Sequence, residues 1–286
     1  MGVKTHPTGF DNIDVLLKGG GLGVGQLGTV IAPTGSGKST FLVQLVNNAV
    51  RNGLNAMYIT LEEHGDRMTS RLETNLIGRG TEYYTDDEGK IDEDKYSALD
   101  AYYKQKLESG EWGKLFIRTR QPYTSTIEDI EQMIIDVKVR SGSDLDVVVV
   151  DYPEIMKKKS SPHTSDEDIM GETFHRIAGL ASKYEFVAWA VAQTNRTAGS
   201  ADTITAHNIQ GAYKVTNSTD FLMTLNRTPE EKQENCLRTY IDKIRYPEPS
   251  ALRPDFLYFK TLVDKGFQVV PENDTEIARH RSLITD

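Results

Sequence analysis

The chain has 286 residues, 38% hydrophobic and 26% charged, which is ordinary for a globular domain with a sizeable core. Its net charge of −9 argues against binding nucleic acid through a broadly basic surface, although an acidic exterior and a local basic channel can coexist. The single cysteine, Cys236, excludes an internal disulfide. No apolar run approaches the roughly 18 residues of a membrane span and the N-terminus carries no signal-like segment, so we expect a cytoplasmic protein without membrane partners.

The predicted elements begin with a short helix that carries Phe10 and Ile13. We expect Thr8 or Asp11 to cap this helix and the glycines at 19–21 to end it. The apolar segments that follow predict buried strands at 27–31, 56–61, 114–117, 147–150 and 186–191. Between these strands the sequence predicts helices up to residue 52, within the stretch 64–112, at 126–140 and at 166–184.

Shorter strands are predicted near the C-terminal end, at 220–225, 237–242, 256–261 and 266–270. Alternating strands and helices, with strands that are apolar on both faces, are typical of a mostly parallel central sheet with helices on both faces. The late strands indicate an antiparallel strand extension along one sheet edge. We therefore expect an α/β fold made by a single domain over residues 1–286.

The segment A-P-T-G-S-G-K-S at 32–39 fits the phosphate-loop (P-loop) pattern G-x-x-x-x-G-K-[ST], with alanine in place of the first glycine. Its glycines let backbone N–H groups turn toward phosphate oxygens, its lysine adds a positive charge there, and its serine hydroxyl can ligate Mg²⁺. The expected nucleotide contacts are Ala32, Pro33, Thr34, Gly35, Ser36, Gly37, Lys38, Ser39 and Thr40. Because a strand precedes this loop and a helix follows it, the sequence predicts binding of ATP with Mg²⁺.

Polar residues follow several of the predicted strands, where ligands bind in open α/β sheets. Asp151 follows a run of four valines and could hold Mg²⁺ through water. Glu62 ends the second strand and could deprotonate the attacking water, and the adjacent Glu63 is its rival for that role. Gln193 ends another apolar strand, where its amide could sense the γ-phosphate. The sequence therefore predicts an ATP-hydrolysing site at this edge.

Lys243 and Arg245 lie two residues apart in a strand pattern, so both cations are expected on one face. Taken alone, this pattern also fits an exposed edge strand. A phosphate-loop site without an obvious arginine of its own often takes one from a neighbouring subunit. The pair is therefore a candidate for a sensor and arginine finger that act on the next subunit.

Together these motifs resemble the DnaB-type replicative helicase domain of the RecA-fold ATPases, particularly its phage versions. The resemblance is carried by P-T-G-F at 7–10 with Asp14, A-P-T-G-S-G-K-S-T at 32–40, I-T-L-E-E at 59–63, V-V-V-V-D-Y at 147–152, A-Q-T-N-R at 192–196 and K-I-R at 243–245. Order and approximate spacing match over about residues 7–270. The resemblance implies a RecA-like P-loop ATPase core, with the catalytic group Lys38, Glu62, Gln193, Lys243 and Arg245.

Members of this family form rings, usually hexamers, that encircle one DNA strand and move 5′ to 3′. The resemblance therefore implies a homo-oligomeric helicase on single-stranded DNA, in the host cytoplasm if it is phage-encoded, with a primase or a helicase loader as further partners. The loops after Asp151 and Gln193 would line the pore. The candidate DNA contacts in them are Lys157, Lys158, Lys159, Arg196 and Lys214. The acidic Glu154 weakens this interpretation slightly.

The resemblance leaves alternatives open. Such helicases usually carry an N-terminal primase-binding domain and a linker helix, which we do not find here, so the chain could be a minimal helicase, a fragment, or a ring that needs a separate partner. The patterns T-G-F-x-x-x-D at 8–14 and G-G-G-L at 19–22 also suit a RadA- or KaiC-like recombination or regulatory ATPase without processive unwinding. A third hypothesis is a binding module, in which nucleotide holds together an oligomer that loads or clamps another protein.

Overall fold

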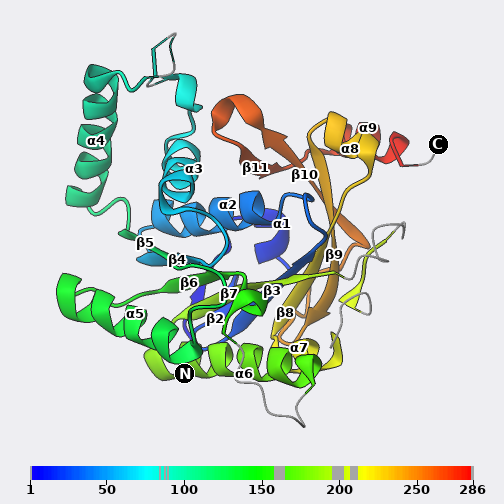
Figure 1. Cartoon of the computed structure of the whole chain (residues 1–286). Coiled ribbons are helices and arrows are strands. Elements are labelled where there is room, and N and C mark those ends of the chain that lie inside the picture. The colour runs from blue at the N-terminus through cyan, green and yellow to red at the C-terminus, as the bar shows by residue number, and fades with distance from the viewer. Residues whose placement is uncertain are drawn as a thin grey trace.

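The computed structural model describes residues 2–83, 85–86, 88, 90–157, 165–194, 203–206 and 212–284. A nine-stranded sheet in the order β11-β10-β9-β8-β3-β7-β6-β4-β5 runs through the molecule (Figure 1). Its parallel strands are β3 (Leu27–Ala32), β4 (Ala56–Thr60), β5 (Leu115–Thr119), β6 (Val147–Asp151), β7 (Val187–Gln193) and β8 (Phe221–Asn226). Its antiparallel strands are β9 (Cys236–Ile244), β10 (Phe256–Leu262) and β11 (Gln268–Pro271). The predicted parallel sheet with an antiparallel extension at one edge is confirmed.

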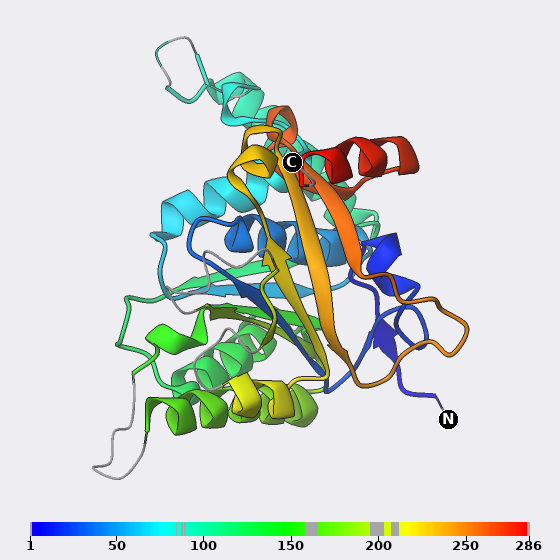
Figure 2. The same cartoon turned by 90° about the vertical axis from the view of Figure 1, so that its right-hand side faces the viewer.

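Helices cover both faces of this sheet (Figures 1 and 2). On one face lie α1 (Asp11–Asp14), α2 (Lys38–Arg51), α3 (Gly65–Ile77) and α4 (Glu93–Glu108). On the other face lie α5 (Ile127–Ser141), α6 (Asp166–Tyr184) and α7 (Ala212–Ser218). The short α8 (Pro229–Gln233) and α9 (Asp274–Ser282) lie together beside the antiparallel strands, and β1 (Thr5–His6) pairs with β2 (Leu22–Gly23) in a separate small sheet.

The apolar runs of the central strands are explained by two hydrophobic cores, one on each face. In β6, Val147 and Val149 belong to the core beneath α2 and α3, whereas Val148 and Val150 belong to the core beneath α5 and α6. Successive strand residues point to opposite faces, so a strand covered on both sides must be apolar throughout. This requirement is why the sequence predicts these strands so closely.

The N-terminal helix differs from its prediction. It spans only Asp11–Asp14, its N-cap residue is Phe10, and no side chain caps it. The backbone N–H and the hydroxyl of Thr8 instead donate to Asp14 Oδ1, both at 2.8 Å. Neither Thr8 nor Asp11 therefore caps the helix. The Thr8 hydroxyl donates to the Asp14 carboxylate instead.

Strand β9 lies between β8 and β10, so the strand that carries Lys243 is not an edge strand. Its register places Ile244 opposite Phe221 at the start of β8, and Arg238 opposite Asn226 at the end of β8. The Lys243–Arg245 pair consequently lies at the end of the sheet opposite to the carboxyl ends of the parallel strands.

Candidate functional site

The phosphate loop connects β3 to α2 and takes its shape from two glycines. Gly35 has φ of 77° and Gly37 has φ of 98°, in the left-handed region where other residues are strained. Gly37 is also the N-cap residue of α2, so the loop ends at a helix N-terminus with unpaired backbone N–H groups. This arrangement is suited to binding anionic phosphate.

Lys38 is the first residue of α2, and its side chain is only 9% exposed. Its Nζ lies 3.7 Å from Glu62 Oε2 and 3.9 Å from the centroid of the Tyr152 ring. Within the described part of the chain, this ammonium has no hydrogen-bond partner. A buried, unsatisfied ammonium is costly, and phosphate oxygens would supply the missing acceptors. The loop and Lys38 therefore fit a nucleoside triphosphate.

Asp151, at the end of β6, is 2% exposed. Its Oδ2 accepts a 2.7 Å hydrogen bond from the Tyr58 hydroxyl, while its Oδ1 has no hydrogen-bond partner among the described residues. Burial, together with the Asp151 carboxylate, raises the pKa of Tyr58 well above its usual value, so this hydroxyl remains a neutral donor. An oriented carboxylate with one unsatisfied oxygen fits the predicted role of holding Mg²⁺ through water. Ser39, the other predicted ligand, is half-buried in the first turn of α2.

Glu62 and Glu63 point in different directions after β4. Glu63 Oε2 accepts a 2.7 Å hydrogen bond from Arg71 of α3, and Arg71 also donates to the Thr40 hydroxyl at 3.2 Å. Glu62 faces Lys38 instead, and its side chain is 51% exposed. Of the two rivals, only Glu62 lies beside the phosphate loop, with an open approach for water.

Gln193 ends β7 directly beside Ala32 at the start of the phosphate loop. Its backbone N–H donates to Glu154 Oε1 at 2.7 Å, and its side chain hydrogen-bonds Tyr152. Burial and the nearby Glu62 and Glu154 carboxylates raise the pKa of Tyr152 to about 12. Glu154 is thus part of the framework that links the ends of β6 and β7.

Lys243 and Arg245 bind the last residues of α7 and the turn that follows it. Lys243 Nζ donates to the carbonyl oxygens of Thr216 and Thr219, both at 2.6 Å. Arg245 donates to Asp220 Oδ1 at 2.8 Å and to the Asn217 carbonyl at 2.9 Å. Because this turn precedes β8, the pair is remote from the phosphate loop of its own chain.

The candidate DNA contacts are only partly described. Lys158, Lys159 and Arg196 lie outside the described residues. Lys157 is exposed, and its backbone N–H donates to the Ser125 carbonyl at 2.8 Å. Lys214 of α7 forms an ion pair with Asp168 of α6, which holds its ammonium within the chain.

Sequence reasoning missed Arg227, which directly follows β8. One of its terminal nitrogens lies 3.9 Å from the position that a Cβ at Gly37 would occupy. Its Nε is buried without a hydrogen-bond partner in the described structure, and burial lowers the pKa of the guanidinium. The rule that identified Asp151 and Gln193, a polar residue at the carboxyl end of an apolar strand, applies equally to Arg227. Tyr58 was also missed, because a tyrosine inside an apolar strand gives no signal beyond core packing.

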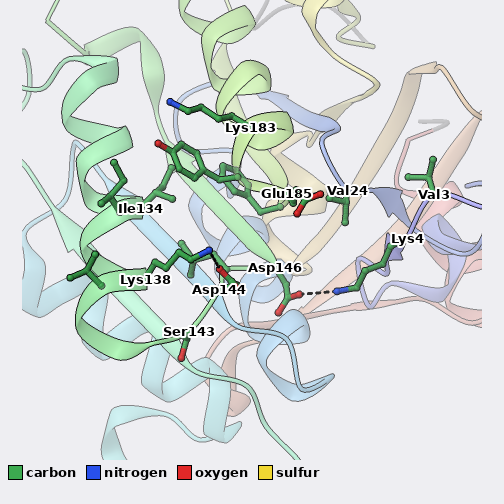
Figure 3. Close-up of a pocket in the computed structure, with 15 residues that line it drawn as sticks. Val3, Lys4, Val24, Ile134, Lys138, Ser143, Asp144, Asp146, Lys183 and Glu185 are labelled. Carbon is green, nitrogen blue, oxygen red and sulfur yellow. Dashed lines mark hydrogen bonds and ion pairs between the residues drawn. The ribbon is translucent and has the colours of Figure 1, made fainter.

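A large hollow lies away from this site, at the end of the sheet where β6 and β7 begin (Figure 3). It measures about 860 Å³ and is lined by Lys4, Lys138, Asp146 and Glu185, among others. Lys4 Nζ lies 3.4 Å from Asp146 Oδ1 across its rim. The parallel strands end on the opposite side, so this hollow is separate from the phosphate loop. None of the described helices is both long enough and apolar enough to cross a membrane.

The chain is similar to several known proteins. The DnaB-like replicative helicase of Enterobacteria phage T4 is 21% identical over 217 residues, which cover 74% of this chain and 44% of that protein. The chain thus spans less than half the length of this curated relative. The DNA repair protein RadA of Mycobacterium tuberculosis is 37% identical over 76 residues, or 27% of this chain and 15% of that protein.

Solved structures show the same fold. A solved ATPase domain superposes with a TM-score of 0.76 at 15% identity, covering 95% of this chain and 92% of that one. A DnaB-like replicative helicase studied with its primase gives a TM-score of 0.72 at 14% identity, covering 93% and 62%. The profile of the DnaB-like helicase C terminal domain matches residues 5–255. Because this profile matches most of the chain, the chain belongs to the DnaB-like helicase C-terminal domain family.

Proposed function

We propose that this chain is the ATP-hydrolysing motor of a ring-forming replicative helicase, which moves 5′ to 3′ along single-stranded DNA and unwinds duplex. The observation that carries this proposal is the pair of unsatisfied buried groups at the phosphate loop. Lys38 Nζ and Asp151 Oδ1 both lack hydrogen-bond partners within the described residues. Burying two such groups is unfavourable unless a ligand satisfies them, and Mg²⁺-bound ATP supplies both an anion and a cation.

The first step is nucleotide binding. Lys38 and the loop N–H groups would bind the phosphates, and Arg227 would add a second positive charge beside Gly37. The Ser39 hydroxyl and Asp151, the latter through water, would hold Mg²⁺. The metal ion would neutralise charge that develops on the phosphate oxygens.

The second step is hydrolysis. Glu62 is the exposed carboxylate beside Lys38, so it would accept a proton from the attacking water. Gln193 would sense the γ-phosphate, because β7 places it next to Ala32. Its hydrogen bonds to Tyr152 and Glu154 would couple the nucleotide state to the segment that follows β6.

The third step requires a neighbour. Lys243 and Arg245 lie at the sheet end away from their own phosphate loop, which supports a role in the next subunit's site. Head-to-tail contacts of this kind give a ring when the rotation between subunits closes, and the homo-oligomer would be a hexameric ring. Single-stranded DNA would pass through the ring, and Lys157, Lys158, Lys159 and Arg196 would be among its contacts. A primase or a loader would dock on the assembled ring.

A second candidate function is supported by the RadA match. A RadA- or KaiC-like ATPase would share the site and the assembly but would not unwind DNA processively. The helicase proposal is preferred, because the DnaB-like family profile and the T4 relative match most of the chain, whereas the RadA match covers 27% of it.

The test is ATP turnover by the purified chain, with and without single-stranded DNA, together with its mass in ATP. The motor proposal expects DNA to stimulate turnover, a ring-sized species, and unwinding of a forked duplex. Stimulation without unwinding of the fork would favour the recombination-type ATPase. A monomer whose turnover ignores DNA would contradict the proposed motor.

A further inference from the structure

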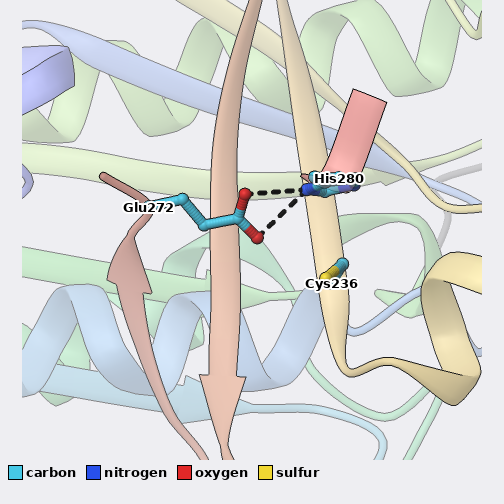
Figure 4. A group of neighbouring side chains, drawn as sticks. All are labelled: Cys236, Glu272 and His280. Atoms are coloured by element: carbon cyan, nitrogen blue, oxygen red, sulfur yellow. Dashed lines mark hydrogen bonds and ion pairs between the residues drawn. The ribbon is translucent and has the colours of Figure 1, made fainter. Parts of the chain in front are cut away.

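A cluster of metal-ligating side chains lies outside the nucleotide site, beside the antiparallel strands (Figure 4). Cys236 begins β9, Glu272 directly follows β11, and His280 lies in α9. One ligand atom from each residue lies within 4.8 Å of the other two. His280 Nδ1 lies 3.0 Å from both Glu272 oxygens, and these two side chains are 1% and 2% exposed. A partly exposed thiol thus converges with a buried imidazole and a buried carboxylate.

The imidazole ring is fixed in this orientation from its other side. His280 Nε2 lies 2.7 Å from Glu231 Oε1, and Glu231 in turn forms an ion pair with Arg238 at 3.0 Å. In metal centres, a ligating histidine commonly donates its second ring N–H to a carboxylate, which sets the tautomer and ring orientation. The Glu231 contact provides this arrangement and leaves Nδ1 facing Cys236 and Glu272.

We propose that Cys236, Glu272 and His280 form a binding site for a Zn²⁺-class cation, distinct from the Mg²⁺ of the phosphate loop. Thiolate and imidazole donors favour Zn²⁺, whereas Mg²⁺ prefers oxygen ligands. Zinc bonds of 2.0–2.3 Å require ligand atoms separated by roughly 3–4 Å, so side-chain movements of about 1 Å would complete the site. Cys236 is partly exposed, which gives the ion a route of entry and leaves a fourth position for water.

The position of the site suggests what the metal would do. It would join the start of β9, the end of β11 and the last described helix, so it would fasten α9 to the sheet. Glu231 lies on α8, which begins two residues after Arg227. The ion would therefore also stiffen the segment that carries Arg227 beside the phosphate loop.

Without a metal, the same side chains form a hydrogen-bonded ionic network. Burial opposes a charged imidazole, but hydrogen bonds to Glu231 and Glu272 outweigh burial and raise the pKa of His280. Metal binding would replace the thiol proton and the imidazole proton, as it does at other cysteine and histidine ligands. A network that never takes up metal is the outcome that would overturn the proposal.

Cobalt(II) is a suitable probe, because the chain has one cysteine. A thiolate-to-cobalt charge-transfer band in the near ultraviolet can therefore arise only from Cys236. The purified chain, stripped with chelator and kept in excess Mg²⁺ to occupy the phosphate-loop site, is titrated with Co²⁺. The proposal expects one equivalent to produce this band and Zn²⁺ to abolish it by displacement. Absence of the band in folded protein would refute the site.

Two variants that retain the cysteine test the other ligands. His280→Gln and Glu272→Gln should each weaken Co²⁺ binding by at least about 10- to 100-fold, the loss seen when only a residue that supports a ligand is removed. His175→Gln, which changes an exposed histidine of α6, should leave it unchanged. Should His280→Gln fail to fold, Glu272→Gln and the wild-type titration still decide the matter. A band of equal strength and affinity in both ligand variants would show that Cys236 binds cobalt without them and would refute the proposed site.

Discussion

Glu62 and Glu63 show how two adjacent residues of the same type are separated by their contacts. Glu63 belongs to a structural ion pair with Arg71, whereas Glu62 extends toward Lys38 with half of its side chain exposed. A general base must reach both water and the reacting phosphate. Sequence position favours Glu62 and leaves Glu63 as its rival, and the side-chain directions separate the two.

Replacing each carboxylate separately tests this distinction. Glu62→Gln should retain ATP binding and lose turnover by about 10²- to 10⁴-fold, because the amide cannot accept the proton. Glu63→Gln should retain turnover within a few fold and lose only part of the Arg71 contact. Steady-state ATPase rates and nucleotide affinity are measured for both. A reversed result, with Glu63→Gln inactive and Glu62→Gln active, would move the base to Glu63.

Arg227 carries a second prediction at this scale. Its guanidinium lies beside Gly37 with a buried, unsatisfied Nε. If it binds the nucleotide, Arg227→Ala should weaken ATP affinity by roughly 10- to 100-fold, the range of one charge-assisted hydrogen bond. Arg253→Ala, in an exposed loop, serves as the matched control. Unchanged affinity in a folded Arg227→Ala protein would leave Lys38 as the main cation of the site.

Among the elements, β3 and β7 approach each other closely where Gly28 lies beside Trp189. Gly28 is opposite Trp189 in the register, and a Cβ at Gly28 would lie 2.6 Å from the indole ring. Real Cβ contacts are essentially never this short, so a larger residue must displace the buried Trp189 or the strand. Glycine is required here by space, since its φ lies outside the left-handed region.

Gly28→Ala should therefore lower the free energy of unfolding by about 1–3 kcal/mol, the usual cost of overpacking a core. Gly179→Ala is the matched control, because Gly179 lies on α6 and a Cβ added there would have no atom within 4 Å. That substitution should be neutral or stabilising by up to about 1 kcal/mol. Urea unfolding of both variants measures the difference. Equal stability of the two proteins would show that Trp189 moves aside at little cost.

Elements that depend on local pattern were predictable from sequence, and elements that depend on distant contacts were not. The strand ending at Asp151 is apolar on both faces, so its position and its terminal carboxylate followed from the sequence. The loop at Thr8 was misjudged because the Asp14 carboxylate competes for its donors. The interior position of β9 was missed because strand order depends on pairing between distant segments. The strand-end rule also applies to Arg227, but its place beside the phosphate loop depends on the pairing of β8 with β3.

Over the whole molecule, the two parts of the proposed machinery lie at opposite ends of the sheet. The phosphate loop, Asp151 and Gln193 lie at the carboxyl ends of the parallel strands, and Lys243 and Arg245 lie at the other end. A single chain cannot bring these parts together, whereas a head-to-tail neighbour can. Replacing Arg245 should leave its partner Asp220 in place, because Asp220 Oδ2 also accepts a 2.9 Å hydrogen bond from the Leu27 N–H.

Mixing two inactive variants tests whether the site is shared. Arg245→Ala should bind ATP and assemble but lose turnover by about 10³-fold or more, and Lys38→Ala should lose nucleotide binding. In a one-to-one mixture, about a quarter of head-to-tail interfaces combine an intact phosphate loop with an intact Arg245. ATPase activity should therefore reappear in the mixture.

Lys38→Ala mixed with Glu62→Gln is the matched control, because every interface in that mixture has a damaged loop or a missing base. It should remain inactive. If the Arg245→Ala and Lys38→Ala mixture also stays inactive while mass measurement shows mixed assemblies, Arg245 does not act on a neighbouring site. Restored activity confined to the first mixture requires that each catalytic centre is completed by the adjacent subunit, because neither variant contains a complete centre of its own.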